Sequence, residues 1–276
     1  MDLPLPWPFE REFMQLALVA GLAVGACAPL IGVFLVQRRM ALLGDGIGHV
    51  AFAGVAAGLL GGVWPVWTAL AAAVVAAVAI ERLRSRNRAT GDLALALFFY
   101  SGIAAGVVLL GLADAIDANA ATYLFGSILT LSPGDAWVAG GLGLTIVATV
   151  ALCGRALFAV ILDEESARVA GMPVDVLNTM LAVLIAVTVV AAMRVVGILL
   201  VAALMVLPVA SGQLVGRSFR ATQVWSVLFG IVAVVVGLAA SRHWGLAPGG
   251  TIVLVAAGLF AVISLAAGRA IQWGLR

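Results

Sequence analysis

The chain has 276 residues, of which 64% are apolar and only 10% are charged, and its mean hydropathy is +1.20. Soluble globular domains carry about 25% charged residues, so the composition excludes that class and predicts one all-α, multi-span membrane domain over residues 1–276. All fifteen basic residues are Arg. Without a Lys the chain cannot form a P-loop, so any ATP must be hydrolysed by another subunit. The net charge of +2 gives no reason to expect nucleic acid as a partner.

Apolar segments follow one another along the chain, each close to the ~20 residues that a helix needs to cross a membrane. We predict about nine membrane-spanning helices, within a range of eight to ten. They are expected at residues 13–36, 46–62, 66–80, 93–112, 136–158, 177–193, 195–215, 224–240 and 251–267. A further apolar segment, 124–131, is too short to span and is a candidate re-entrant or interfacial piece.

The charges between these spans predict the orientation of the chain. Arg residues gather at 38–39, 82–88 and 217–220 and in the C-terminal tail, whereas the segment 114–119 has two Asp and no Arg. Basic loops remain in the cytoplasm, so we expect the N-terminus outside and the C-terminus in the cytoplasm, as an odd number of spans requires. The acidic residues near the N-terminus, Asp2, Glu10 and Glu12, do not fit the basic start of a cleaved signal peptide.

The second predicted span contains two ionisable residues, Asp45 and His49. Their separation of four residues is about one helical turn, so both side chains leave the same face, ~6 Å apart along the axis. Ionisable groups in a bilayer cost about 2.5–3.5 kcal/mol and usually line a pathway. Carboxylate and imidazole are also the oxygen and nitrogen ligands of borderline divalent metals. We therefore interpret the pair as a metal station on a transport route.

Alternative interpretations of the two residues remain open at this point. His49 could hydrogen-bond a backbone carbonyl of a neighbouring helix, and Asp45 could be stabilised at a helix start by the helix dipole. If the pair does bind metal, two ligands leave a tetrahedral shell incomplete. A symmetry mate, water or other helices would have to supply the rest.

Two further features are candidates for function. The charged segment 162–173 is typical of a short amphipathic helix, which is either a capped surface turn or a docking helix for a peripheral subunit. Its candidate docking residues are Asp163, Glu164, Glu165, Arg168 and Gly171. Pro208, inside an apolar span, is expected to kink its helix and could act at a gate. Glycines at small-xxx-small spacing, Gly54/Gly58 and Gly102/Gly106, predict close helix contacts.

Five segments together resemble the permease subunit of ATP-binding-cassette importers for zinc, manganese and iron, of the zinc-uptake type. They are the Gly44-Asp45-x-x-x-His49 block, the Thr-Tyr-Leu-Phe-Gly-Ser segment 122–127, the acidic segment 163–173, the segment 197–201 that leads to Pro208, and the Pro-Gly-Gly-Thr-Ile-Val segment 248–253. The resemblance covers nearly the whole chain. One departure is that Gly48 and Ala53 stand where family members often have Ser and Pro, which predicts a straighter helix near His49.

The resemblance implies a homodimeric channel in the bacterial cytoplasmic membrane, in contact with lipid. It would receive metal from an extracytoplasmic binding protein and be powered by two copies of a cytoplasmic ATPase, with ATP bound there and no permanent cofactor in this chain. Segment 162–173 would be the coupling helix on the ATPase. Asp45 and His49 would match the metal-coordinating positions, and the imidazole favours zinc over manganese or iron.

Two other functions compete with the importer. An ion-coupled secondary transporter of a metal or small solute could use Asp45 as a proton or cation site, and inverted repeats would favour it; none is visible in the sequence. An intramembrane hydrolase would need a third protein ligand and a general base beside Asp45 and His49. We therefore expect a transporter subunit rather than an enzyme.

Overall fold

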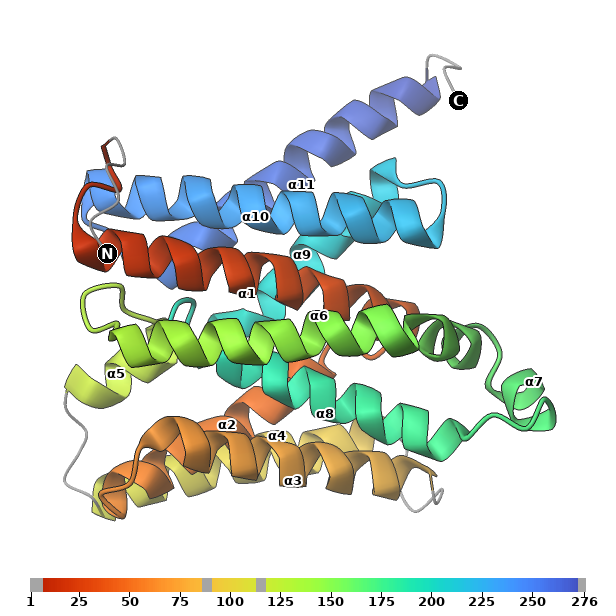
Figure 1. Cartoon of the computed structure of the whole chain (residues 1–276), viewed down its shortest axis with the longest axis horizontal. Coiled ribbons are helices and arrows are strands. Elements are labelled where there is room, and N and C mark those ends of the chain that lie inside the picture. Colours follow the sequence, from red (N-terminus) through yellow and green to blue (C-terminus); the bar gives the residue numbers. More distant parts are fainter. Residues whose placement is uncertain (1–6, 86–90, 113–117, 273–276) are drawn as a thin grey trace.

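The computed structural model describes residues 7–85, 91–112 and 118–272. Over these residues all regular secondary structure is helical, which confirms the predicted all-α class (Figure 1). In chain order the helices are α1 (Glu12–Gln37), α2 (Leu43–Leu60), α3 (Pro65–Ser85), α4 (Gly91–Leu112), α5 (Ala118–Phe125), α6 (Pro133–Leu162), α7 (Glu164–Val169), α8 (Val174–Ala192), α9 (Ile198–Val215), α10 (Phe219–Trp244) and α11 (Pro248–Gln272).

Nine helices in the described part of the chain are long and apolar enough to cross a membrane, which confirms the predicted number. Only α5 and α7 are too short to span. The basic loop at 86–88, the acidic loop at 114–117 and the last residues, 273–276, lie outside the described residues. The orientation predicted from those loops therefore remains a prediction.

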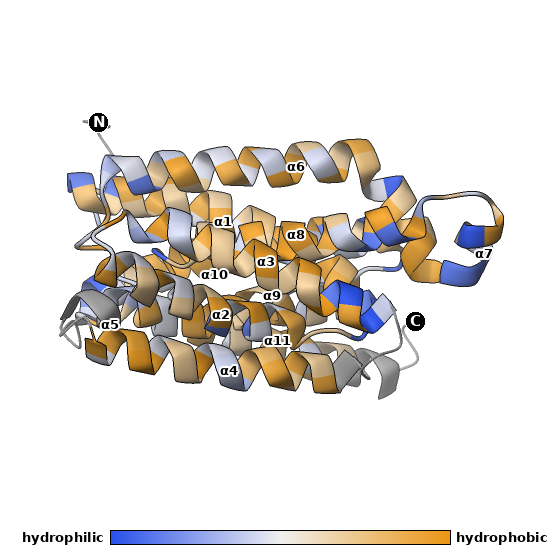
Figure 2. Ribbon diagram, turned by 90° about the horizontal axis from the view of Figure 1, so that it is seen from below, coloured by the Kyte–Doolittle hydropathy of each residue, from blue (hydrophilic) through white to orange (hydrophobic). Residues whose placement is uncertain are grey.

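The spans lie roughly side by side, and their ends form two faces of the molecule (Figure 1). α1 packs against α6, α8, α9 and α10, whereas α2 packs against α3, α4, α8 and α9. The start of α1 lies at one face together with α5, and α7 projects beyond the other face, where α11 also ends. Apolar residues predominate along the spans, and hydrophilic residues concentrate near the ends and in α7 (Figure 2).

Five of the six exposed tryptophans among the described residues mark the face at which α1 begins, and the sixth, Trp225, lies near the start of α10. These five tryptophans lie at or near helix ends on that side, as expected for the aromatic belt at a membrane–water boundary. They are Trp7, Trp64, Trp67, Trp137 and Trp244. The opposite face, from which α7 projects, therefore lies across the hydrophobic layer from this belt.

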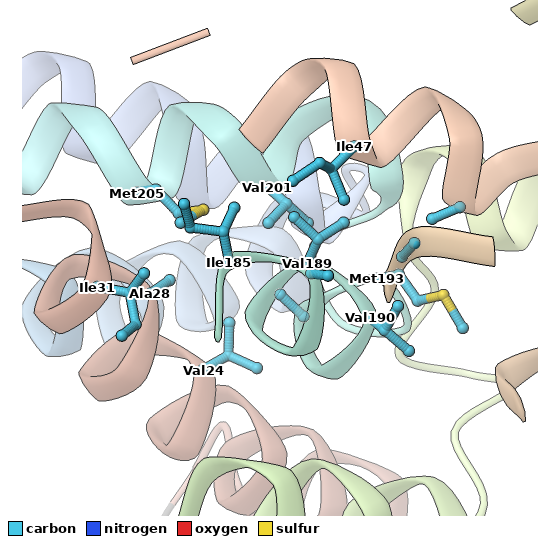
Figure 3. Close-up of a cluster of buried hydrophobic side chains, with 14 of the residues drawn as sticks. Val24, Ala28, Ile31, Ile47, Ile185, Val189, Val190, Met193, Val201 and Met205 are labelled. Atoms are coloured by element: carbon cyan, nitrogen blue, oxygen red, sulfur yellow. The ribbon is translucent and has the colours of Figure 1, made fainter. Parts of the chain in front are cut away.

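A buried apolar cluster joins the central helices (Figure 3). Ile31 of α1, Ile47 of α2, Ile185 of α8 and Met205 of α9 all contribute to it and are inaccessible to solvent or nearly so. Lipid tails are as apolar as these side chains, so close packing and dispersion rather than exclusion of water hold such helices together. The cluster fixes the face of α2 that carries Ile47.

Glycines allow the close helix contacts that their spacing predicts. A Cβ atom added to Gly54 of α2 would lie 2.7 Å from the backbone oxygen of Thr68 in α3. A Cβ atom added to Gly102 of α4 would lie 2.8 Å from the backbone carbon of His49 in α2. α2 is thus held between α3 and α4 by backbone-to-backbone contact.

The short apolar segment 124–131 lies at the face where α1 begins (Figure 1): its first two residues end α5, and the rest connects α5 to α6. Gly126 and Gly197 both have positive φ, 74° and 90°. A Cβ atom added to Gly126 would overlap the backbone next to Gly197, and a Cβ atom added to Gly197 would overlap the backbone next to Gly126. The Ser127 amide donates to the carbonyl of Arg194 at 3.3 Å, so the segment is fastened to the turn between α8 and α9.

Arg194, in that turn, also holds the start of α6. Its guanidinium lies 3.1 Å from the Asp135 carboxylate, donates to the carbonyl of Thr130 at 2.7 Å and lies 4.7 Å from the centroid of the Tyr123 ring. Asp135 also completes a capping box with Ser132 at the start of α6. Asp135 therefore acts as a structural residue.

Candidate metal site and coupling segment

Asp45 lies in the first turn of α2, and His49 follows one turn later. The Nε2 atom of His49 and the Oδ1 atom of Asp45 are 3.8 Å apart. α2 runs without interruption past Gly48 and Ala53, and the straighter helix expected near His49 stays a prediction. A metal ion about 2.1 Å from each of two ligand atoms can bridge up to about 4.2 Å. The two side chains are therefore within reach of one ion.

Burial differs between the two side chains. His49 is only 8% exposed, because α4 covers it. The centroid of the Phe99 ring lies 4.3 Å from that of the imidazole, nearly edge-on, and Gly102 brings the backbone of α4 against that of His49. The Asp45 side chain is 30% exposed. The imidazole is thus held in place by α4, while the carboxylate remains accessible.

A cavity of about 290 Å³ opens beside Asp45. Its lining comes from the α2 side and from α4, and Tyr100 is 69% exposed. The lining residues are Leu42, Asp45, Leu95, Ala96, Phe99 and Tyr100. The carboxylate therefore borders an open cavity rather than a closed packing contact. In the described part of the chain no three His, Cys, Asp or Glu side chains come together, so a bound ion would need ligands from outside these residues.

The charged segment after α6 forms the six-residue helix α7. Asp163 caps its start by accepting hydrogen bonds from the backbone amides of Glu165 and Ser166, at 3.1 and 3.0 Å. The hydrogen bonds from the Ser166 side chain and amide, followed by that from Glu165, lower the pKa of the Asp163 carboxyl. Gly171, with φ 78°, then turns the chain toward α8.

Ion pairs tie α7 to two spans. Glu164 lies 3.5 Å from Arg38 at the end of α1, and 3.3 Å from Arg168 within α7. Arg168 in turn lies 3.3 Å from Asp175 in the first turn of α8. Movement of α7 would therefore pull on the ends of α1 and α8.

A second ion pair lies at the same face of the bundle. Glu81 and Arg84 of α3 make two hydrogen bonds, at 2.7 and 3.1 Å, and Glu81 is buried. Burial, and then the charge of Arg84, lower the pKa of the Arg38 guanidinium. Arg38, Arg39 and Arg84 line a cavity of about 350 Å³ that shares Leu42 and Leu95 with the cavity beside Asp45.

The outer side of α7 is free of such contacts in the part of the chain that the structure describes. Val169 is 85% exposed, and Glu165 is exposed as well. α7 projects from the bundle at its own end of the molecule (Figure 2). The helix thus has an inner side that is tied to the spans and an outer side that is open to a partner.

Pro208 is buried within α9, which continues through it. Proline lacks an amide hydrogen, so the carbonyl one turn earlier loses its helical hydrogen bond. Next to it, Gly32 of α1 brings its backbone against that of Met205. The structure thus places Pro208 at a tight contact between α1 and α9, and its predicted role in gating remains a prediction.

The spacing of residues in the sequence predicts that Asp45 lies beside His49 and that Asp163 to Arg168 form one helix, but it does not predict which distant residues surround them. Phe99 lies some fifty residues from His49 along the chain, and no local pattern links them. Arg38 and Glu164 are even farther apart. The spacing of Gly102 was a usable signal, because it predicted a close contact on α4 although not the contact's partner.

A family model described as the ABC 3 transport family matches residues 10–267. The chain belongs to the ABC 3 transport family. Together with the metal-transport relatives described next, membership makes it the membrane-spanning permease subunit of a metal importer rather than an enzyme, and a multi-pass protein of the cell membrane. Membership sets aside the ion-coupled secondary transporter and the intramembrane hydrolase.

The similarity to known proteins covers nearly the whole length of this chain and of each relative. A probable metal transport system membrane protein of Treponema pallidum is 36% identical over 246 residues, which cover 89% of this chain and 92% of that protein. The manganese import system permease protein ScaB of Streptococcus parasanguinis is 31% identical, with 92% of this chain and 90% of that protein covered. The solved structure of PsaBC from Streptococcus pneumoniae in complex with Fab has a TM-score of 0.83 at 30% identity, covering 92% of this chain and 91% of that chain.

Proposed function

We propose that Asp45 and His49, together called the metal pair, hold a divalent metal ion in transit through an ATP-driven importer. This chain would form half of the membrane channel of that importer. The observation that carries the proposal is the 3.8 Å separation of carboxylate and imidazole beside a cavity open to the surface. Ionisable groups within a span are costly unless they serve a pathway. A structural metal site would be closed by four ligands, whereas this pair leaves room for release.

A second copy of the chain would complete the site. The cavity opens beside the outer side of α4, where Leu97 and Tyr100 are exposed. A two-fold axis near this surface would bring two carboxylates and two imidazoles together, which is a full tetrahedral set. The homodimer therefore supplies what the described residues of one chain lack.

The identity of the metal is the finer part of the proposal. Imidazole softens the ligand set and favours zinc over manganese or iron. The relative from Streptococcus parasanguinis is named for manganese, so the donor atoms and the relative's name point to different ions. We propose a divalent first-row metal, with zinc expected from the ligands, and the uptake experiment below compares zinc with manganese directly.

The remaining parts of the importer follow from the two faces of the molecule. We propose that α7 is the coupling helix, seated on one of two cytoplasmic ATPase subunits that bind ATP. An extracytoplasmic binding protein would then deliver metal at the tryptophan-lined face. Arg38, Arg39 and Arg84 line the neighbouring cavity on the side of α7, so this side of the molecule is basic, as expected of a cytoplasmic face.

The test is metal uptake by cells that depend on this permease under chelation. Asp45→Asn and His49→Gln should each reduce zinc or manganese uptake to the background of cells without the permease, because either change removes one of two ligands. His243→Gln is the matched control, since His243 is the other histidine of the chain and is exposed near the end of α10. It should transport normally.

Amounts of each variant in the membrane must equal those of the unaltered protein. Normal uptake by both Asp45→Asn and His49→Gln would overturn the assignment of the metal pair. The ratio of zinc to manganese uptake in the unaltered protein, with both ions at equal concentration, decides the metal. A preference for manganese would overturn the expectation from the donor atoms while leaving the site in place.

A further inference from the structure

A groove of about 640 Å³ lies on the flank of the bundle and shares no lining residue with the cavity beside Asp45. α1 lies between α6 and α10 in Figure 1, and the groove uses residues from all three helices and from the turn before α10. Phe34 of α1 contributes to its floor, Phe158 of α6 and Phe219 of α10 to its walls. All three residues lie toward the face from which α7 projects.

The inside of the groove is apolar and aromatic. The Phe219 ring lies between the other two, with its centroid 5.3 Å from that of Phe34 and 4.3 Å from that of Phe158. Gly154 leaves the wall open, because an added Cβ atom would make only ordinary contacts, 3.5 Å from Val150 and 4.0 Å from Phe34. This interior suits a hydrocarbon chain.

The rim of the groove is cationic. Arg155 of α6 and Arg220 of α10 line it, together with the polar residues Ser218 and Gln223. Both guanidinium groups are exposed, and neither makes an ion pair or a side-chain hydrogen bond with another described residue. The lining contains no carboxylate, and the start of α10 adds the partial positive charge of a helix N-terminus. The rim therefore attracts an anion.

The groove opens on the outward side of a membrane-spanning helix. α6 is one of the spans, and Leu152 on it is 85% exposed. A ligand that enters the groove from this side must be soluble in the bilayer, and it must carry a negative group at the level of the helix ends. Guanidinium groups at a membrane surface attract anionic headgroups and bind phosphate oxygens through charge-assisted hydrogen bonds.

We propose that the groove is a binding site for an anionic phospholipid. The phosphate lies between Arg155 and Arg220, and one acyl chain runs over Phe34 and past Gly154. The lipid thereby joins α6 to α10 across α1. This proposal does not depend on the metal pair or on the proposed coupling role of α7.

The test is the thermal unfolding of the purified, delipidated full-length protein in detergent. Phosphatidylglycerol should raise the melting temperature in a saturable way, because a ligand of the folded state stabilises it. Phosphatidylcholine with the same acyl chains and inorganic phosphate should not. Arg155→Gln/Arg220→Gln should weaken the apparent affinity for phosphatidylglycerol about tenfold or more, as loss of two charge-assisted contacts implies. Arg217→Gln, outside the groove lining, should leave it unchanged.

A steric variant tests the acyl-chain part without altering charge. Gly154→Leu places a side chain into the groove, whereas Gly141→Leu is its control on the same helix, where an added Cβ atom meets nothing within 4 Å. Gly154→Leu should abolish the lipid-dependent shift, and Gly141→Leu should keep it. Equal shifts with both lipids, an equal shift with inorganic phosphate, or a full shift in Gly154→Leu would each overturn the proposal.

Discussion

At the scale of single residues, the position of the His49 imidazole depends on a glycine of the neighbouring helix α4. Gly102 lets α4 approach so closely that a Cβ atom would lie 2.8 Å from the backbone carbon of His49 and 2.8 Å from the backbone nitrogen of Val50. Cβ atoms essentially do not approach backbone atoms this closely, so any other residue there must push α4 away from α2. The Phe99 ring, which lies against the imidazole, would move with it.

Gly102→Ala should therefore lower both stability and metal uptake. Overpacking of a tight contact costs about 1–3 kcal/mol, and the shift of α4 would uncover His49. The control is Gly111→Ala on the same helix, where an added Cβ atom meets nothing within 4 Å. Alanine favours the helix over glycine by up to about 1 kcal/mol, so that variant should be as stable as the unaltered protein or more so. Denaturant unfolding in detergent and uptake under chelation measure the two effects, and equal behaviour of the two variants would contradict the explanation.

At the scale of elements, α7 combines two kinds of surface in six residues. Glu164 on its inner side pairs with Arg38 and Arg168, whereas Glu165 next to it is exposed and Val169 is almost fully so. The inner side connects α7 to the end of α1, and α2 with the metal pair begins a few residues later. A partner seated on the outer side could thus influence the segment that leads to Asp45.

Glu164→Gln and Glu165→Gln should consequently fail in different ways. Glu165→Gln changes the outer side and should reduce the amount of ATPase that copurifies with the permease. Glu164→Gln should keep the ATPase bound but lower the metal transported per ATP hydrolysed, because it removes the charge shared by Arg38 and Arg168. Partly exposed ion pairs contribute only about 0–1 kcal/mol to folding, so both variants should fold. An unchanged ratio of transport to hydrolysis in Glu164→Gln would contradict the role of this pair.

Features that depend on neighbouring residues in the sequence could be predicted. Features that depend on contacts between distant parts of the chain could not. The span expected at 93–112 matches Leu93–Leu112, because length and hydropathy alone define it. The pair of Asp45 and His49 follows from helical spacing in the same way. The segment 124–131 remained ambiguous, since its place depends on Arg194 and Gly197, some seventy residues later. The contact between the His49 imidazole and the Phe99 ring likewise follows only from the packing of α4 against α2.

At the scale of the whole molecule, the two faces differ in charge and aromatic content. Arg38, Arg39 and Arg84 gather at the face from which α7 projects, whereas the opposite face carries most of the exposed tryptophans. Basic residues remain on the cytoplasmic side of a membrane. The proposed ATP-driven mechanism and the proposed delivery of metal from outside both require this orientation, because the ATPase subunits would draw on cytoplasmic ATP.

The orientation can be tested with cysteines at the two ends of α3. Val63 precedes this helix and Ser85 ends it, and both are exposed. After Cys27 and Cys153 are replaced by Ala, Val63→Cys should react with a membrane-impermeant maleimide in intact cells, and Ser85→Cys should react only after lysis. The Arg84 side chain beside Ser85 makes this expectation a consequence of the positive-inside rule. The opposite pattern would place α7 outside the cell, out of reach of any ATPase, and would overturn its coupling role while leaving the metal pair untouched.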